Sequence, residues 1–264
     1  MKKLGLGLGF AVLGLLAACG GSADNETTIR IGATAVPHAE ILGQAREAVV
    51  EQGFELEIVI FDDFITPNIA LDSGEIDMNF YQHSLFLGNF NENHNTDLVA
   101  AFGVHFEPFR VYAGRLDTLE NIPNGASIAI PDDPTNEARA LEFLQYLGLI
   151  ELNTGLGINA TVQDVSHNPH NLDIRPMEAF MLPRVLPDVD FAVINANIAL
   201  NGEVFYRAID GAVEQANSNF INYIVVRSGD ENSQKLQALI NAISTDHVRN
   251  FIYETYENRV LPQF

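Results

Sequence analysis

Three aromatic side chains and a histidine lie within eight residues in the first half of the chain. Residues 79–83 (Asn-Phe-Tyr-Gln-His) are followed by Phe86. Aromatic rings offer a large apolar surface, and thioether side chains make favourable contacts with them. Phe80 alone is typical of plain core. A histidine between polar neighbours suits a dry core poorly, so we predict that Tyr81, His83 and Phe86 line a pocket.

Arg139 lies near the start of a predicted helix that follows an apolar strand. Asp133 can cap this helix, with Pro134 at its first position. The positive end of a helix does not favour an arginine. Exposed amides at a helix start and a guanidinium together form a good clamp for a carboxylate, because such contacts are bidentate and charge-assisted. A surface arginine paired with Glu142 or an aspartate explains the residue equally well.

Two asparagines stand at the ends of later apolar strands. Asn195 directly follows the strand expected at 190–194, and Asn222 opens the strand expected at 222–226. An asparagine oxygen accepts a hydrogen bond from an ammonium, and its nitrogen donates to a carboxylate. Taken singly, such an asparagine is more often a turn or capping residue.

The only cysteine belongs to a motif at the start of the chain. After the basic start Met1-Lys2-Lys3, residues 4–16 are apolar and uncharged, and Ala17-Ala18 leads directly into Cys19. This order is typical of a bacterial secretory signal, and a cysteine at the cleavage point is typical of a lipobox. The apolar stretch is shorter than the about 20 residues that cross a bilayer. We therefore predict a signal peptide over 1–18 and a lipid anchor on Cys19, with more than one acyl chain.

These candidate residues must be positioned by alternating strands and helices. The small, polar residues 19–27 predict a flexible tether. The patterns over 28–32, 41–52 and 54–60 predict a strand, a helix that Gly53 ends, and a second strand. Because the connections are short, these elements form a right-handed βαβ unit with a parallel sheet.

The same order returns later in the chain. Further strands are expected at 126–130, 190–194 and 222–226, a helix at 136–147, and helical patterns up to the C-terminus. We expect two α/β lobes with a cleft between them. Residues 28–110 with 223–264 form the first lobe, and 111–222 form the second. Ligands of such sheets bind beyond the carboxyl ends of strands, which is where the candidate residues lie.

The chain is strongly acidic, with a formal net charge of −21. Outside the signal peptide Lys235 is its only lysine. Nucleic-acid binding is excluded, because neutralising phosphates needs basic residues. The negative field also repels anionic ligands unless a local cation captures them. A salt-tolerant source explains the acidic surface without giving it a role. No disulfide is possible once Cys19 is acylated, so stability must come from packing.

Seven segments carry a resemblance to a known family: 37–40, 61–64, 77–86, 133–136 with Arg139, 168–172, 182–184 and 192–195. In these segments, which run in family order, the chain resembles the methionine-binding lipoproteins of bacterial ABC uptake systems, the NlpA lipoprotein family. The set is specific, although no single segment is. The resemblance implies a type II periplasmic-binding-protein fold that encloses methionine between two lobes, without cofactor or catalysis.

The resemblance also implies partners, a location and roles for seven residues. The partners are an ABC permease with its ATPase, and the location is the cell membrane, facing the periplasm or the exterior. Arg139 would grip the ligand carboxylate, and Asn195 and Asn222 would hold its α-amino and carboxylate groups. The thioether would be walled by Phe64, Tyr81, His83 and Phe86.

Two departures from the family pattern leave the ligand open. Phe64 and Phe86 stand where the family often has tyrosine, and Asn197-Ile198 replaces a stretch that often carries an aromatic ring. The ligand is therefore L-methionine, D-methionine, a methionine-containing dipeptide or another amino acid.

An enzyme and a metal-binding lipoprotein are the alternatives. No G-x-S-x-G is present and Cys19 is acylated, so nucleophilic catalysis has no support. Ser84 follows His83, and adjacent side chains of an extended segment point to opposite sides. The seven histidines form no H-E-x-x-H motif and no tight cluster in the sequence. His167 and His170 lie in a segment typical of a loop.

Overall fold

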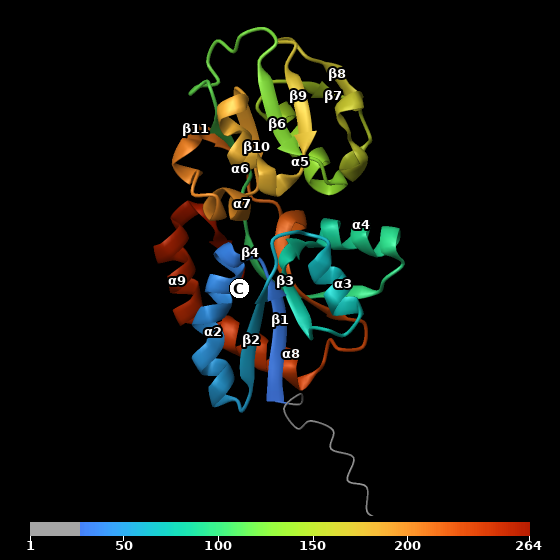
Figure 1. The fold of residues 1–264 in the computed structure, drawn as a ribbon, viewed down its shortest axis with the longest axis vertical. Helices are drawn as coiled ribbons and strands as arrows, with labels where there is room; N and C mark the ends of the chain where they lie inside the picture. The colour runs from blue at the N-terminus through green and yellow to red at the C-terminus, as the bar shows by residue number, and fades with distance from the viewer. Residues whose placement is uncertain (1–26) are drawn as a thin grey trace, which may run out of the picture.

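The computed structural model describes residues 27–264, so the predicted signal peptide, Cys19 and nearly all of the tether lie outside the described residues. Figure 1 shows two lobes stacked along the long axis of the molecule, each built around its own sheet with helices packed against it. Within residues 27–264, no helix is long and apolar enough to cross a membrane.

The lower lobe in Figure 1 contains a six-stranded sheet in the order β13-β4-β12-β3-β1-β2. Its strands are β1 Thr28–Ala33, β2 Glu55–Ile60, β3 Met78–His83, β4 Leu98–Phe106, β12 Ile221–Arg227 and β13 Leu261–Pro262. Strand β1 is parallel to β2 and β3, whereas β12 is antiparallel to β3 and β4. The predicted βαβ unit is confirmed, since helix α2 (Glu40–Glu51) joins β1 to β2.

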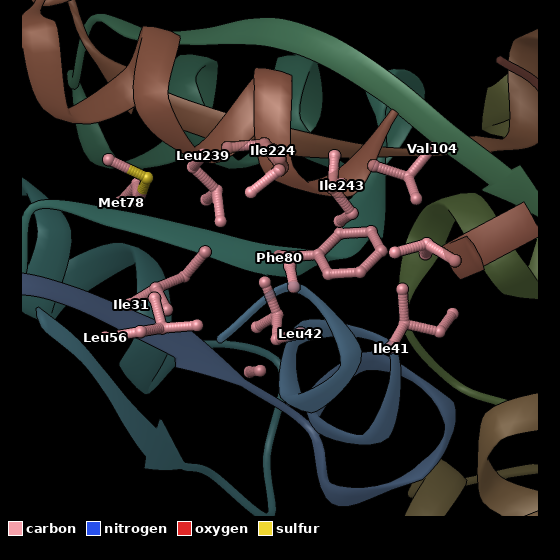
Figure 2. Packing of buried hydrophobic residues seen from close by; sticks show 14 of the residues in the cluster. Ile31, Ile41, Leu42, Leu56, Met78, Phe80, Val104, Ile224, Leu239 and Ile243 are labelled. Carbon is pink, nitrogen blue, oxygen red and sulfur yellow. The ribbon is translucent and has the colours of Figure 1, made fainter. Parts of the chain in front are cut away.

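Helices cover both faces of this sheet. Besides α2 they are α3 Thr66–Asp72, α4 Ser84–His94, α8 Gln234–Ile243 and α9 Asp246–Tyr256. Helices α2, α8 and α9 share one apolar core with the sheet, and α3 and α4 pack on the opposite face. Figure 2 shows the first core, in which Phe80 lies among Ile41, Leu42 and Ile243 with no exposed surface. The prediction that Phe80 is a core residue is confirmed.

The upper lobe contains a five-stranded sheet in the order β11-β5-β10-β6-β9. Its strands are β5 Arg110–Ala113, β6 Ser127–Pro131, β9 Asp173–Met177, β10 Phe191–Ile194 and β11 Ala208–Val213, with β7 Glu151–Leu152 and β8 Val165–His167 paired separately. Helix α5 (Pro134–Tyr146) packs on one face, and α6 (Leu182–Val185) and α7 (Ala196–Asn201) pack on the other.

Short helical turns complete the described chain: η1 Ala35–Ala39, η2 Gly157–Asn159, η3 Val162–Asp164, η4 Ala179–Met181, η5 Leu186–Asp188, η6 Phe205–Arg207, η7 Ser218–Phe220 and η8 Glu257–Arg259. The chain passes between the two sheets twice, through residues 107–109 after β4 and through residues 214–220 after β11. The lobe boundaries expected from the sequence stay predictions.

The elements expected from hydrophobic periodicity and capping lie within two residues of their expected ends. Asp133 caps α5 as predicted, since its carboxylate accepts a hydrogen bond of 3.1 Å from the backbone N–H of Asn136. Gly53 follows α2 with φ +85°, a left-handed conformation that favours glycine at a helix end.

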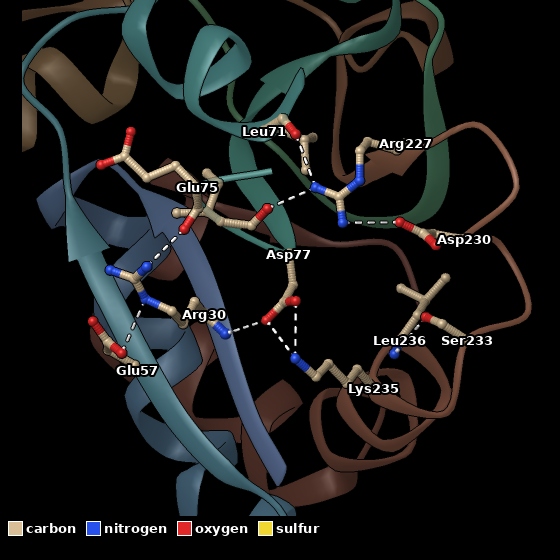
Figure 3. Close-up of polar contacts among 11 residues, drawn as sticks. Arg30, Glu57, Leu71, Glu75, Asp77, Arg227, Asp230, Ser233, Lys235 and Leu236 are labelled. Carbon is tan, nitrogen blue, oxygen red and sulfur yellow. Dashed lines mark hydrogen bonds and ion pairs between the residues drawn. The ribbon is translucent and has the colours of Figure 1, made fainter. Parts of the chain in front are cut away.

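The acidic turn before β3, residues 72–77, is held by Arg30, Arg227 and Lys235 from three other segments (Figure 3). Asp77 accepts hydrogen bonds from the backbone N–H of Arg30, at 2.7 Å, and from Nζ of Lys235, at 2.9 Å. Nη1 of Arg227 donates to the carbonyl oxygens of Leu71 and Ile76, each at 2.8 Å. This turn therefore fixes where β3 begins, and β3 carries two of the candidate site residues.

Candidate ligand-binding site

A pocket of about 360 Å³ lies between the two lobes and contains all seven residues predicted from the sequence. The lower lobe, the upper lobe and the connection after β4 all contribute to its lining: Phe64, Tyr81, Gln82, His83, Phe86, Glu107, Phe109, Asn136, Arg139, Asn195, Ala196, Asn197 and Asn222. The ligand contacts of the seven residues stay predictions.

Arg139 lies in the second turn of α5 and is only 4% exposed. Its Nε and Nη2 donate to the two carboxylate oxygens of Glu214, at 2.9 and 2.6 Å, and Nη2 also donates to the backbone oxygen of Glu107. The guanidinium carbon lies 3.9 Å from the ring centre of Phe109 and 4.2 Å from that of Phe220. The surface interpretation, with Glu142 as partner, is wrong because the residue is buried and paired elsewhere.

The guanidinium keeps one donor edge open. Among the residues described, Nη1 of Arg139 makes no hydrogen bond. Glu214 itself is fixed, since its carboxylate accepts from the backbone N–H of Phe109 at 2.9 Å. A buried guanidinium without a counter-charge is costly, and Glu214 offsets that cost while leaving Nη1 available. The arrangement suits a carboxylate that enters the pocket.

His83 ends β3 and caps α4. Its Nδ1 accepts from the backbone N–H of Phe86 at 3.1 Å, and its Nε2 lies 3.3 Å from Oδ1 of Asn136 in the other lobe. Burial, and to a smaller extent the positive charge of Arg139, lowers the pKa of His83 to about 3. The ring is therefore neutral, with its proton on Nε2, and both nitrogens are occupied by the protein. His83 offers the pocket a ring surface.

The other three wall residues form an aromatic cluster. Phe64 stacks against Tyr81 with ring centres 6.0 Å apart, and it meets Phe86 edge-on at the same distance. The hydroxyl of Tyr81 donates to the backbone oxygen of Phe64 at 2.8 Å, so it is not free to bind a ligand. Burial raises the pKa of Tyr81 well above its ordinary value. This side of the pocket suits an unbranched, polarisable apolar group.

The two asparagines present opposite polar atoms. Asn195 lies between β10 and α7, and its Oδ1 is buried without a hydrogen-bond partner among the described residues. Oδ1 of Asn222 is 3.3 Å from Nε2 of His38, and Nδ2 of Asn222 has no hydrogen bond within the described chain. Asn195 therefore has an acceptor to offer to an ammonium, and Asn222 has a donor to offer to a carboxylate.

Glu107 is a pocket residue that the sequence did not indicate. Its Oε1 accepts from Nε2 of His105 at 2.7 Å, and its Oε2 accepts from the backbone N–H of Asn197 at 2.9 Å. Burial alone raises the pKa of Glu107, but His38, His105 and the Asn197 N–H together hold it below its ordinary value. An ionised carboxylate thus faces the pocket. The only feature of the sequence that could have indicated a pocket residue here is the position of Glu107 directly after the strand β4.

Glu107 also belongs to a cluster of buried side chains that no sequence motif indicates. Side-chain ligand atoms of His38, His105 and Glu107 lie within 4.8 Å of one another. The contact between His105 and Glu107 is a direct hydrogen bond of 2.7 Å. Ligand atoms around a tetrahedral metal stand about 3.3 Å apart, because each lies about 2.0 Å from the ion. The cluster has the geometry of a hydrogen-bonded network.

Comparisons with known proteins agree with this architecture. The family model of the NlpA lipoproteins matches residues 29–264. The solved structure of lipoprotein Tp32 from Treponema pallidum is 40% identical, with a TM-score of 0.85 over 89% of this chain and 99% of that one. The methionine-binding lipoprotein MetQ of Bacillus subtilis is 33% identical over 271 residues, 99% of each chain. A nutrient binding protein from Burkholderia cenocepacia, solved bound to methionine, is 36% identical, with a TM-score of 0.85 over 89% of this chain and 100% of that one.

Proposed function

Since the chain belongs to the NlpA lipoprotein family, we propose that it is the substrate-binding lipoprotein of an ABC importer and that it captures free methionine. The observation that carries the proposal is the composition of the pocket, which combines an open guanidinium edge, an unpartnered amide oxygen and an aromatic wall. The names of the Bacillus subtilis and Burkholderia cenocepacia relatives support the same ligand. The protein binds and releases its ligand without a chemical step.

The polar ends of the pocket assign an orientation to the ligand. The carboxylate of methionine accepts from Nη1 of Arg139 and from Nδ2 of Asn222. Its ammonium donates to Oδ1 of Asn195 and lies against the carboxylate of Glu107. The ammonium thus meets an ionised group, and the carboxylate meets a guanidinium that Glu214 only partly neutralises. A zwitterion satisfies both ends, whereas an uncharged ligand leaves them unpaired.

The methionine side chain lies against Phe64, Tyr81, His83 and Phe86. The hydroxyl of Tyr81 and both ring nitrogens of His83 are bound within the protein, so this wall has no polar group to spare. An acidic or basic ligand side chain is desolvated there without compensation. A flexible thioether fits an irregular aromatic surface better than a branched side chain does.

We extend the proposal to the partners and the location. The lipid on Cys19 would hold the protein at the cell membrane, facing the periplasm or the exterior. The loaded protein would then deliver methionine to a permease that is driven by its ATPase. Support comes from the family, which consists of lipoproteins, and from relatives that are named as binding proteins of transporters.

A ligand screen tests the function. Bound ligand is first removed from the purified mature protein by partial unfolding, and melting is then measured with each amino acid. We expect L-methionine to stabilise strongly, norleucine more weakly, and leucine or glutamate hardly at all. Stabilisation grows as RT ln(1 + [L]/Kd), about 2.7 kcal/mol at one hundred times Kd. D-methionine and methionine dipeptides complete the screen, and the absence of any shift with all methionine ligands would refute the proposal.

A further inference from the structure

We propose that His38 is a positioning residue, which holds the side-chain amide of Asn222 so that its Nδ2 faces the ligand carboxylate. This inference deepens the proposed function and rests on it. His38 does not line the pocket and has no exposed surface. It lies in the turn η1 after β1, whereas Asn222 is the second residue of β12, 184 residues later in the chain.

A chain of two hydrogen bonds carries the inference. Oγ1 of Thr34 lies 2.8 Å from Nδ1 of His38, and Nε2 of His38 lies 3.3 Å from Oδ1 of Asn222. All three residues are buried. An amide oxygen is only an acceptor, so Nε2 must carry the ring proton. In a neutral ring Nδ1 is then bare, and it accepts from the hydroxyl of Thr34.

The neutral state of this ring follows from its surroundings. Burial, together with His105, lowers the pKa of His38 to about 4 against the opposing effects of Glu107 and Asn222. The ring is also held in place sideways, since its centre lies 4.7 Å from that of Phe80 and 4.9 Å from that of His105. The direction of the Nε2–H bond is therefore fixed by packing.

Fixing the amide matters because an asparagine side chain has nearly the same shape when its oxygen and nitrogen are exchanged. In the flipped arrangement, Oδ1 of Asn222 points at the ligand carboxylate and repels it. The backbone of Asn222 does not prevent a flip, because the strand pairs with β3 and β4 whichever way the side chain lies. Within the described chain, Oδ1 of Asn222 has His38 as its hydrogen-bond partner, so His38 selects the binding arrangement.

Nε2 of His38 also lies 3.4 Å from Oε1 of Glu107. One ring nitrogen thus contacts a residue at each end of the proposed ligand, Asn222 at the carboxylate and Glu107 at the ammonium. A change at His38 that acts through Asn222 must be separated from one that acts through Glu107. Measuring the His38 variant in an Asn222→Ala background makes that separation, because an effect that acts through Asn222 is absent there.

The test is a double-mutant cycle of His38→Phe with Asn222→Ala, in which methionine affinity is measured by calorimetry. We expect His38→Phe to weaken binding about tenfold in the wild-type background and less than threefold in the Asn222→Ala background. His38→Gln, whose amide nitrogen replaces Nε2, should retain affinity within about threefold. The ratio of affinities for methionine and methioninamide should fall in His38→Phe as it does in Asn222→Ala.

Thr34→Val provides a second route to the same interaction. It keeps the side-chain volume and removes the donor to Nδ1, so it should weaken binding by a smaller factor that again disappears in the Asn222→Ala background. If His38→Phe and Thr34→Val each lower the affinity by the same factor with and without Asn222→Ala, the inference is overturned and the proposed function stays intact. A wild-type protein that binds no methionine overturns the proposed function and the inference with it.

Discussion

At the scale of single residues, the pocket is polarised by the bonds that its side chains make elsewhere. Glu214 occupies Nε and Nη2 of Arg139, and His38 occupies Oδ1 of Asn222. Arg139 keeps Nη1 and Asn222 keeps Nδ2 as a donor for the ligand, whereas Asn195 keeps Oδ1 as an acceptor. The number of remaining groups matches one carboxylate and one ammonium, which is why a free amino acid fits the site.

Arg139→Ala should weaken methionine binding by about 2–5 kcal/mol, because it removes one partner of a buried charge pair. The variant should also lose some stability, since Glu214 is left buried without its guanidinium. Calorimetry on the folded variant separates the two effects. Arg175→Ala is the control, because Arg175 forms an exposed pair with Asp173. Affinity close to wild type in Arg139→Ala would remove Arg139 from the site.

Glu107→Gln should lower the affinity for methionine at least tenfold, because hydrogen bonds to charged groups contribute about 1.5–3 kcal/mol. The loss should be confined to ligands with an ammonium group. Binding of the analogue that lacks the amino group, 4-methylthiobutyrate, should be weak and equal in both proteins when measured by competition. An equal loss for both ligands would show that Glu107 only supports the fold.

At the scale of elements, the start of α5 connects helix capping to the pocket. Asp133 caps the helix by accepting from the backbone N–H of Asn136. Both of its carboxylate oxygens also accept from Nδ2 of Asn136, at 3.0 and 2.9 Å. Oδ1 of Asn136 in turn meets His83 across the cleft. The cap therefore also holds Asn136, which contacts His83 of the other lobe at the pocket.

Asp133→Ala should reduce both stability and methionine affinity, because it removes the cap and frees Asn136. The expected stability loss is about 0.5–2 kcal/mol. Thr245→Ala is a matched control, since Thr245 caps α9 through the N–H of Val248 and does not line the pocket. Denaturation and calorimetry should show a stability loss in both variants and an affinity loss in Asp133→Ala alone. Equal affinities would separate the cap from the site.

At the scale of the whole molecule, two neutral histidines make stability depend on pH. The pKa of His38 is lowered to about 4 and that of His83 to about 3, mainly by burial in each case. Their pKa in the unfolded chain is about 6.5. Between these values the unfolded state binds the protons and the folded state does not. The stability that depends on these two neutral rings is therefore fully present above about pH 6.5 and is lost as the pH falls.

We expect the free energy of unfolding to decrease between pH 6.5 and pH 5 by up to about 1.4 kcal/mol per pH unit for each of the two histidines. Urea denaturation at pH 7, 6 and 5 measures the slope. His83→Gln should flatten it, whereas His247→Gln should leave it unchanged because His247 is exposed. A slope that is the same in all three proteins would contradict the assignment.

The predicted lipid anchor also concerns the whole molecule. Cys19→Ala should leave the protein unprocessed or free of the membrane, because no acyl chain can then be attached. Cell fractionation with detection of the mature and precursor sizes measures this. The control is Ser22→Ala, which changes a residue beyond the predicted cleavage point. Mature Cys19→Ala protein in the membrane fraction would refute the lipobox.

Several elements of each lobe, and their order along the chain, could be predicted from the sequence alone. Periodicity and capping residues located the helices and strands that they predicted to within two residues, because both depend on neighbours in the chain. Strands β3, β4, β5, β9 and β11 were not predicted. Together with the family resemblance, the sequence also determined the two-lobed α/β fold, which the superposed structures confirm. The seven predicted site residues lie at element ends or in short motifs, where local signals are strong, and the structure brings them to one pocket.

How those residues are partnered follows from the tertiary packing and not from the local sequence. Arg139 bonds to Glu214, 75 residues away, and His38 bonds to Asn222, 184 residues away. No spacing rule connects such positions, since periodicity reports which face of an element is buried and not what lies against it. The role of Glu107 was hidden for the same reason. The pairs form where the two lobes and their connections meet, and those pairs decide which polar atoms remain for a ligand.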